Sequence, residues 1–412
     1  MIKRNILKEI LNTTKHFPVT IVSGPRQVGK STLLYSEFVK LGYDYVTLDD
    51  SFEKDLAKND PVTFMKNHPA PVIIDEVQKA KELFPEIEKI VNESRLKKGN
   101  LESNGMFILS GSQSKALLKD AEETLAGRAT IIKMQPLSTN EIYGRDDVPF
   151  TVDTETISER IKDFTLDESN LYQIIYRGHM PGINADDDMP VSRFFSSYIQ
   201  LYLERDVPEV LEIKNESEFL KFLRLAAANI GQEVVYDNLA RSLGVTSVTV
   251  KSWVNVLIAT GVARLVEPYN EISLRKRITK RPKLYFFDTG LAAYLIGIRD
   301  AEGIKNSYLK GALVENYIMN EIYKSYINNG LDQELFYYRD TNQNEIDLVL
   351  NENGNMHLIE CKSGARYNLS DIKQFKELKD TRLNKGKSGI ICTADKLSAL
   401  SEDIYLIPLS AI

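Results

Sequence analysis

Cysteine, long apolar runs and an excess of positive charge are all lacking in this sequence. Its 412 residues include two cysteines, Cys361 and Cys392, each in a strand-like segment, which excludes a disulfide framework and predicts buried free thiols. No apolar run approaches the ~18 residues that cross a membrane. Charges interrupt every apolar stretch at the start, MIKRNILKEILN, which predicts an amphipathic helix rather than a signal peptide. We therefore expect a cytoplasmic protein with no membrane partner.

The charge balance excludes a protein that coats nucleic acid with its whole surface. The net charge is −6 and the isoelectric point is about 5.6. Any nucleic-acid surface must therefore be local. The chain is 43% hydrophobic and 27% charged, as expected of a soluble globular protein, and it is long enough for two or three domains with their own cores.

The clearest motif is GPRQVGKS at residues 24–31, which fits the phosphate-loop spacing G-x-x-x-x-G-K-[ST]. A β-branched run precedes it and a helical pattern follows it, which is the context the motif requires. Lys30 would reach the β- and γ-phosphates and Ser31 would ligate Mg²⁺, while backbone N–H groups and the helix N-terminus hold the phosphates. The predicted ATP-binding residues here are Gly24, Pro25, Arg26, Gln27, Val28, Gly29, Lys30, Ser31 and Thr32.

Two acids end the next apolar strand, PVIIDEV at residues 71–77. We assign Asp75 to the Mg²⁺ that accompanies ATP and Glu76 to the general base that activates water. A third strand, MFILSGS at 106–112, ends in small polar residues, of which Ser110 is our candidate for sensing the γ-phosphate. Ser112 and Gln113 are further candidates, and a Ser-Gly turn that merely closes a core strand explains the segment equally well.

Arg128, in LAGRATIIK, has two interpretations that the sequence does not separate. It stabilises transition-state charge in a neighbouring subunit of a homo-oligomer, or it pairs with an acid inside its own domain. Asp49 and Asp50, in YVTLDD, either face the site or cap a loop.

These motifs, in this order, resemble the bacterial and archaeal AAA-type ATPases of uncharacterised role. The resemblance rests on GPRQVGKS, YVTLDD, VIIDEVQ, ILSGSQS and LAGR followed by QPLSTNE, and it continues through RGHMPGI, YLERDV, KLYFFDTGL and EIDLVL…IECKSG. It implies a P-loop domain followed by a C-terminal region of unknown function. Lys81 departs from it, since the family often has proline there, which changes a loop and leaves the catalytic assignments intact.

The middle of the chain predicts a winged helix-turn-helix. Two apolar-faced helical segments flank Gly244 and a strand follows, with Thr246 or Ser247 capping the second helix. Residues 224–286 contain ten Lys or Arg against four acids, and six of the ten lie in SLRKRITKRPK. We interpret this excess as a surface for the phosphate backbone of DNA, with a solvated loop on an ATPase lid as the alternative.

The segment EIDLVLNENGNMHLIECK at 345–362 predicts a β-hairpin that turns at Asn353-Gly354. If that turn forms, Asp347 stands opposite Glu360 on one face. Carboxylates opposed at about 5 Å repel one another, so they require a proton, a cation or a metal between them.

With Lys362 two residues beyond Glu360, the pattern resembles the core motif of the PD-(D/E)xK nuclease fold. The resemblance implies that Asp347, Glu360 and the upstream helical Glu315 hold Mg²⁺ while Lys362 positions water or steadies the transition state. A salt-bridged hairpin that cuts nothing and a degenerate fold kept for binding are the alternatives.

The sequence therefore predicts an α/β protein of four parts. These are a P-loop ATPase domain with a parallel AAA-type sheet (1–144), a linker and helical bridge (145–217), a winged helix-turn-helix (218–285) and a nuclease-like α/β domain (286–412). The expected ligands are ATP and Mg²⁺, the expected partner is DNA, and nuclease activity stays open. The runner-up function is a non-catalytic ATP switch that binds a protein partner.

Overall fold

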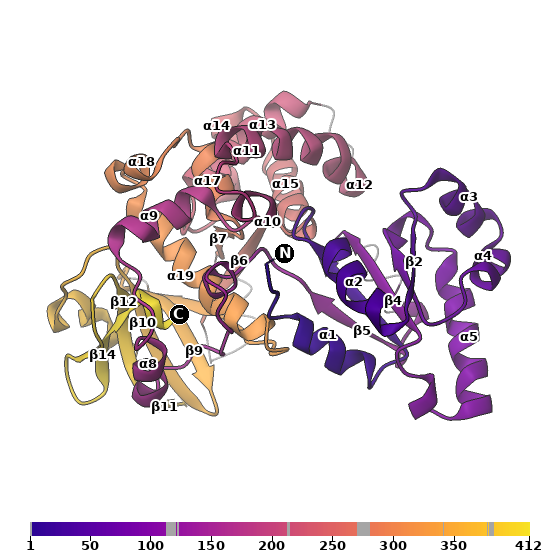
Figure 1. The fold of residues 1–412 in the computed structure, drawn as a ribbon. Helices are drawn as coiled ribbons and strands as arrows, with labels where there is room; N and C mark the ends of the chain where they lie inside the picture. The colour runs from indigo at the N-terminus through magenta and orange to yellow at the C-terminus, as the bar shows by residue number, and fades with distance from the viewer. Residues whose placement is uncertain are drawn as a thin grey trace.

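The fold was analysed in a computed structural model, which describes residues 2–112, 121, 123–211, 215–269, 281–340, 342–376, 378 and 383–412. Two β-sheets organise it, one in the N-terminal third and one in the C-terminal half, with helices between and around them (Figure 1). The predicted α/β fold with a parallel P-loop-type sheet is confirmed.

The first sheet has five parallel strands in the order β2-β3-β4-β1-β5. They are β1 (Val19–Gly24), β2 (Asp44–Thr47), β3 (Val72–Asp75), β4 (Phe107–Ser112) and β5 (Ala129–Lys133). Alternate residues along each strand point to opposite faces of the sheet. Val22, Ile73 and Ile108 pack toward α1 (Leu7–Thr14) and α2 (Lys30–Phe38). Their neighbours along the strands pack toward α3 (Ser51–Asn59), α4 (Pro61–Asn67) and α5 (Leu83–Lys98). Both faces are thus covered, which explains the continuous apolar runs of these strands.

The second sheet is mixed and has nine strands, with the main order β13-β14-β12-β10-β9-β8-β6-β7 and β11 paired to β10. The strands are β6 (Ala263–Pro268), β7 (Lys283–Phe286), β8 (Phe336–Arg339), β9 (Glu345–Glu352), β10 (Asn355–Cys361), β11 (Asn384–Lys385), β12 (Ser388–Cys392), β13 (Ser398–Ala399) and β14 (Ile404–Pro408). Because β6 pairs with β8, the sheet runs across residue 286, where the sequence places a domain boundary. The domain limits stay predictions.

The predicted hairpin register is confirmed as far as Leu348 opposite Ile359, while the expected pair of Asp347 with Glu360 lies one step beyond and stays a prediction. Asn353 and Gly354 both have positive φ, 51° and 81°, as the mirror-image turn requires. Glu352 then faces Asn355, and the pairing continues in step to Leu348 opposite Ile359. Both cysteines are buried free thiols, Cys361 on β10 and Cys392 on β12.

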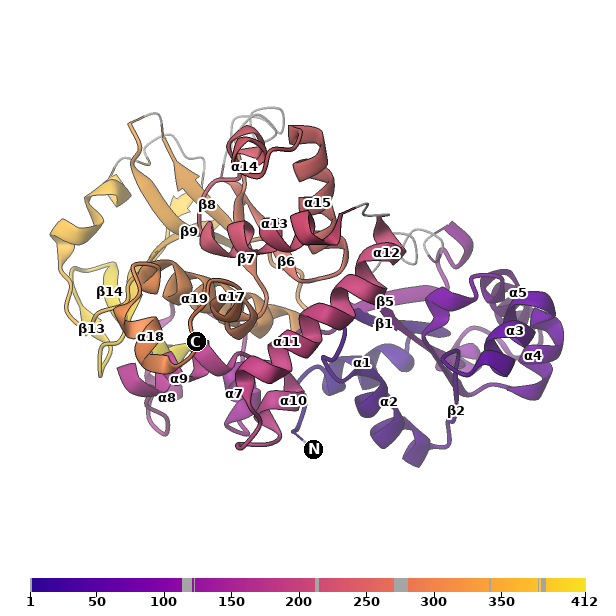
Figure 2. The same cartoon turned by 90° about the horizontal axis from the view of Figure 1, so that it is seen from above.

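The remaining helices lie between the two sheets and around the second one (Figure 1). They are α7 (Thr139–Ile142), α8 (Thr154–Arg160), α9 (Glu168–Arg177), α10 (Pro181–Asn184), α11 (Val191–Leu201), α12 (Val207–Val210), α13 (Glu216–Ala228), α14 (Tyr236–Leu243), α15 (Ser247–Ala259), α17 (Thr289–Leu295), α18 (Ala301–Asn306) and α19 (Lys310–Ile327). A π-helical turn, Tyr202–Asp206, joins α11 to α12. We call these three elements the α11–α12 rod, and Figure 2 shows it extending from the helices beside the second sheet toward the first sheet. The helix α19 is buried along most of its length.

The pair α14 and α15 meets at 106° across Gly244, which has φ 70°. The side chain of Thr246 caps α15 by accepting the N–H of Thr249, so the first of the two predicted caps is the one used. Among the described residues, no single helix is long and apolar enough to cross a membrane; only this bent pair passes that test, on length and composition alone.

Candidate functional site

The phosphate loop lies between β1 and α2, as its sequence requires. Gly29 caps α2 with a φ of 90°, a backbone conformation that residues with a side chain rarely adopt. Gly24 is required for a different reason: a Cβ there would lie 2.2 Å from the carbonyl oxygen of Met134. The two glycines of the motif are therefore both fixed by geometry, one by backbone conformation and one by close approach.

Lys30 turns back onto its own loop. Its ammonium donates to the carbonyl oxygens of Gly24 and Pro25, each at 2.8 Å. Burial lowers the pKa of Lys30 to about 8, although the nearby Glu76 and Asp75 oppose that shift. Neutral carbonyls compensate a buried cation poorly, so the loop is prepared for an anion.

The two acids at the end of β3 have different surroundings. Asp75 is buried, and it accepts hydrogen bonds from the hydroxyls of Tyr45 (2.8 Å) and Ser110. Glu76 has the left-handed φ of 57°, which costs a non-glycine residue of the order of 1 kcal/mol. Its Oε2 accepts a hydrogen bond of 2.5 Å from Gln78. The strained turn separates the two carboxylates, so that Glu76 lines the pocket described next.

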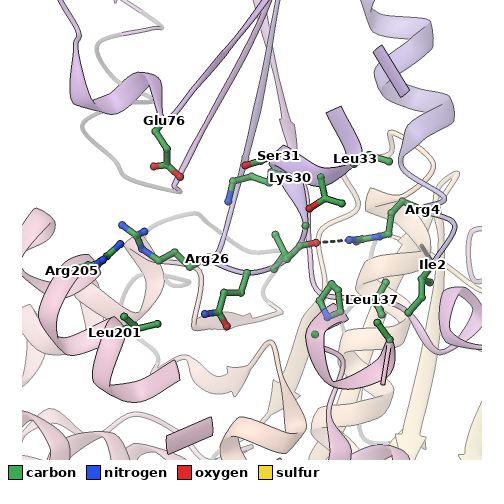
Figure 3. Close-up of a pocket in the computed structure, with 17 residues that line it drawn as sticks. Ile2, Arg4, Arg26, Lys30, Ser31, Leu33, Glu76, Leu137, Leu201 and Arg205 are labelled. Carbon is green, nitrogen blue, oxygen red and sulfur yellow. Dashed lines mark hydrogen bonds between the residues drawn. The ribbon is translucent and has the colours of Figure 1, made fainter. Parts of the chain in front are cut away.

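A cavity of about 590 Å³ opens at the phosphate loop (Figure 3). Among the described residues, its charged lining consists of Arg4, Arg26, Lys30 and Arg205, with Glu76 as the single carboxylate. Residues 26–32 of the predicted set line it, whereas Gly24, Pro25, Asp75 and Ser110 lie behind that lining. Its apolar lining comes from separate segments and includes Ile2, Val28, Leu33, Leu137, Pro181, Ala185 and Leu201.

The sequence did not point to Arg4, whose side chain holds the phosphate loop through hydrogen bonds. This buried guanidinium donates to the carbonyl oxygens of Val28 (2.6 Å) and Gln135 (2.7 Å) and pairs with Glu141 (3.1 Å). The segment 135–141 also contacts α19, because Glu321 accepts the N–H of Thr139 at 2.6 Å. A continuous set of buried polar contacts therefore joins the phosphate loop to α19.

Two motifs that had no role in the sequence meet at this pocket. YLERDV supplies the π-helical turn, where Asp206 pairs with Arg26 of the phosphate loop and Arg205 lines the cavity. In Figure 3, Arg26 and Arg205 extend to the same end of the pocket as Glu76. RGHMPGI supplies Pro181. The resemblance was the only sequence signal for these residues.

Arg128 lies away from the cavity. Its guanidinium donates to Asn92 (2.8 Å) and pairs with Glu88 (3.2 Å), both on α5, which corresponds to the intradomain interpretation. Asp50 caps α3 and Asp49 pairs with Lys79. The candidate Gln113 lies outside the described residues.

The structure brings the predicted C-terminal acids close together. Asp347 accepts the N–H of Cys361 (2.8 Å), and Lys362 donates to Glu360 at 2.6 Å. Burial, then the charge of Asp347, raises the pKa of Glu315 to about 7 and that of Glu360 to about 8. For both acids, the charge of Asp347 acts in the same direction as burial.

A lysine that the sequence analysis had counted toward a DNA surface lies inside this cluster. Lys283, on β7, is 1% exposed and pairs with Glu345 (2.5 Å), Glu315 (3.1 Å) and Asp347 (4.0 Å). Arg264, counted with it, is only partly exposed and donates to the carbonyl oxygen of Met319. Among the described residues, no group of three or more His, Cys, Asp or Glu is arranged to hold a metal ion.

Comparison with known proteins divides the chain in three. Residues 16–143 match the AAA domain family, 168–302 a domain of unknown function (DUF8612) and 310–412 another domain of unknown function (DUF4143). The uncharacterized protein Rv2008c of Mycobacterium tuberculosis is 24% identical over 412 residues, covering 100% of this chain and 84% of the relative. The uncharacterized protein MJ1544 of Methanocaldococcus jannaschii is 24% identical over 390 residues, covering 92% and 82%.

Among solved structures, the chain is similar to the Walker-type ATPase PABY2304 of Pyrococcus abyssi. The TM-score is 0.45 at 14% identity, covering 72% of this chain and 96% of the other. The RuvB Holliday junction branch migration motor of Thermotoga maritima has a TM-score of 0.32 at 16% identity, covering 63% and 88%. The family match and the loop geometry support an AAA-type P-loop domain at residues 16–143, and residues 310–412 match a domain of unknown function.

Proposed function

We propose that the chain is a Mg²⁺-dependent ATPase that passes its nucleotide state to its helical and C-terminal parts. The observation that carries the proposal is the charged lining of the phosphate-loop cavity, four cationic side chains against one carboxylate. Arg4 and Arg26 also pair with Glu141 and Asp206, which do not line the cavity, and a triphosphate adds negative charge on the side of the cavity itself. The N-terminus of α2 adds the partial positive charge that phosphate groups favour.

In this proposal the predicted residues divide the work. Lys30 exchanges its two backbone carbonyls for β- and γ-phosphate oxygens, which are charged and therefore stronger acceptors. The donor set of Ser31 and Asp75 suits Mg²⁺, which prefers hydroxyl and carboxylate oxygens. When bound, Mg²⁺ neutralises charge that develops on the phosphates. Ser110 holds Asp75 in place through its hydroxyl.

Glu76 is the general base. Its left-handed backbone directs the carboxylate to the cavity, and Gln78 fixes one of its oxygens. We assign the other oxygen, Oε1, to the attacking water. The apolar lining at Ile2 and Leu137, which Figure 3 shows at the other end of the pocket from Glu76, then takes the adenine ring.

Coupling to the rest of the chain runs through the π-helical turn. The ion pair of Arg26 with Asp206 joins the phosphate loop directly to the α11–α12 rod. A γ-phosphate competes with Asp206 for the same guanidinium, so nucleotide binding weakens the pair and releases the rod. Loss of phosphate after hydrolysis restores it.

We assign DNA to the winged-helix-like unit formed by α13–α15 and the β6–β7 hairpin. Its 106° helix pair and the exposed Lys251 on α15 support this assignment, while residues 270–280, with most of the basic run, lie outside the described part of the chain. The runner-up is an ATP switch that binds a protein partner, and the 74% exposed Val248 on the same helix favours it. Self-association into a homo-oligomer is a further part of the proposal.

The test is ATP turnover and nucleotide affinity measured on the same preparations, with and without duplex DNA at two salt concentrations. We expect Lys30→Ala to abolish binding and Glu76→Gln to keep binding while kcat falls by about 10²–10⁴-fold. Full turnover in Glu76→Gln would refute the base assignment. DNA stimulation that falls with salt supports the DNA role. A salt-insensitive protein complex without DNA stimulation supports the runner-up.

A further inference from the structure

The acids of the C-terminal cluster already share a cation that belongs to the protein. The ammonium of Lys283 lies between Glu315 of α19 and Glu345 and Asp347 of β9. These are the oxygens that a divalent ion bound to Glu315 and Asp347 would need. A lysine ammonium and a metal ion are therefore mutually exclusive here.

The fold holds Lys283 in that position from several sides. β7 pairs with β6, and the backbone of Lys283 bridges to Glu233. Its ammonium lies 5.3 Å from the ring centroid of Tyr337, a distance at which cation and ring attract. The hydroxyl of Tyr285 donates to Glu315 at 2.5 Å, which fixes the acid as well as the base.

The other acids of the cluster have cationic partners too. Glu345 also pairs with Arg339 at 3.4 Å, and Glu360 pairs with Lys362 at 2.6 Å. Four carboxylates are thus faced by three basic side chains, counting Lys283. Removing one partner from a buried ion pair leaves a charge that costs about 3–5 kcal/mol, so the arrangement resists displacement of Lys283.

We propose that Lys283 is the resident cation of this cluster, taking the place that a divalent metal occupies in a nuclease of this motif. The chain therefore binds no divalent metal there and does not cleave through it. The lysine instead fastens the β6–β7 hairpin to α19 and β9. Without Lys283 the same carboxylates form a divalent-metal site.

Mn²⁺ alone is the probe, added to full-length protein without nucleotide and monitored by the electron paramagnetic resonance signal of free Mn²⁺ and by thermal melting. Wild type and Asp347→Asn are both expected to show no saturable Mn²⁺ binding. Mn²⁺ should leave the Tm of each protein unchanged. Lys283→Ala is expected to gain one saturable site and a Mn²⁺-dependent rise in Tm. Adding Asp347→Asn to Lys283→Ala should abolish both gains. Lys305→Ala, at an exposed lysine of α18, is the matched control and should behave as wild type.

The comparison of wild type with Asp347→Asn decides the matter even where Lys283→Ala fails to fold. Saturable Mn²⁺ binding by wild type that Asp347→Asn removes would overturn the proposal. So would Mn²⁺-dependent cleavage of DNA by wild type that Asp347→Asn abolishes. A folded Lys283→Ala protein that gains no Mn²⁺ site would equally contradict it.

Discussion

The burial of Lys30 predicts a pH-dependent stability in the nucleotide-free protein. Folding lowers the pKa of this ammonium from its usual 10.5 to about 8, chiefly through burial. The unfolded chain holds this proton more tightly than the folded state does. The free energy of unfolding is therefore lowered by the full amount below pH 8, and it rises again as the pH increases toward 10.5. The pKa difference corresponds to a change of about 3 kcal/mol in the free energy of unfolding, and about 2 kcal/mol of that change occurs between pH 7 and 9.5.

The perturbation is Lys30→Met, which keeps the length and removes the charge. Free energies of unfolding are measured by urea denaturation of both proteins from pH 7 to 9.5, so that all other titrations cancel in the difference. Relative to the variant, wild type should gain about 2 kcal/mol over this range. Saturating Mg²⁺-ATP should remove that gain, because phosphate charge holds the proton on Lys30.

Lys251→Met, at an exposed lysine of α15, is the control and should run parallel to wild type at every pH. A difference between wild type and Lys30→Met that stays flat with pH would refute the reasoning. It would mean that the ammonium is not desolvated on the loop carbonyls of the free protein.

Three further predictions follow from named contacts. Arg4→Met should destabilise the protein by about 3–5 kcal/mol in urea unfolding, because Glu141 stays buried without its partner, and adding Glu141→Gln should recover part of that loss. Arg128→Ala should lower the free energy of unfolding by at most about 1 kcal/mol, through loss of its pair with Glu88, and should keep ATP turnover. A large fall in kcat that is rescued by mixing with a variant that cannot bind ATP would instead assign Arg128 to the site of a neighbouring subunit. Asp206→Asn should leave ATP affinity within about threefold while abolishing the ATP-dependent change in hydrogen exchange along α11, and an unchanged exchange response would contradict the coupling route.

Local patterns explain what the sequence predicted well. The phosphate loop needs only one strand, two glycines and one helix, all within about twenty residues. The hairpin register followed from Asn353-Gly354, because a two-residue turn fixes every pair beyond it. In both cases short-range geometry leaves few alternatives.

Contacts between distant segments explain what the sequence did not predict. Arg4 contacts the carbonyl of Gln135, and Asp206 reaches back to Arg26, with no spacing rule to relate them. Lys283 looked like part of a basic surface run because its neighbours in sequence are basic. Tertiary packing alone turned its side chain inward, onto acids of α19 and β9.

Continuity of the second sheet affects how the protein should be divided into fragments. A cut at the predicted boundary of residue 286 removes β6 and most of β7, and with β6 one of the two strands that pair with β8. The fragment 286–412 would present β8 as a bare sheet edge, which invites pairing between copies and aggregation. It would also leave Glu315 and Asp347 without the lysine that neutralises them. Fragments intended for crystallisation or for binding screens should therefore begin ahead of α13, so that both strands of the hairpin remain with the sheet they complete.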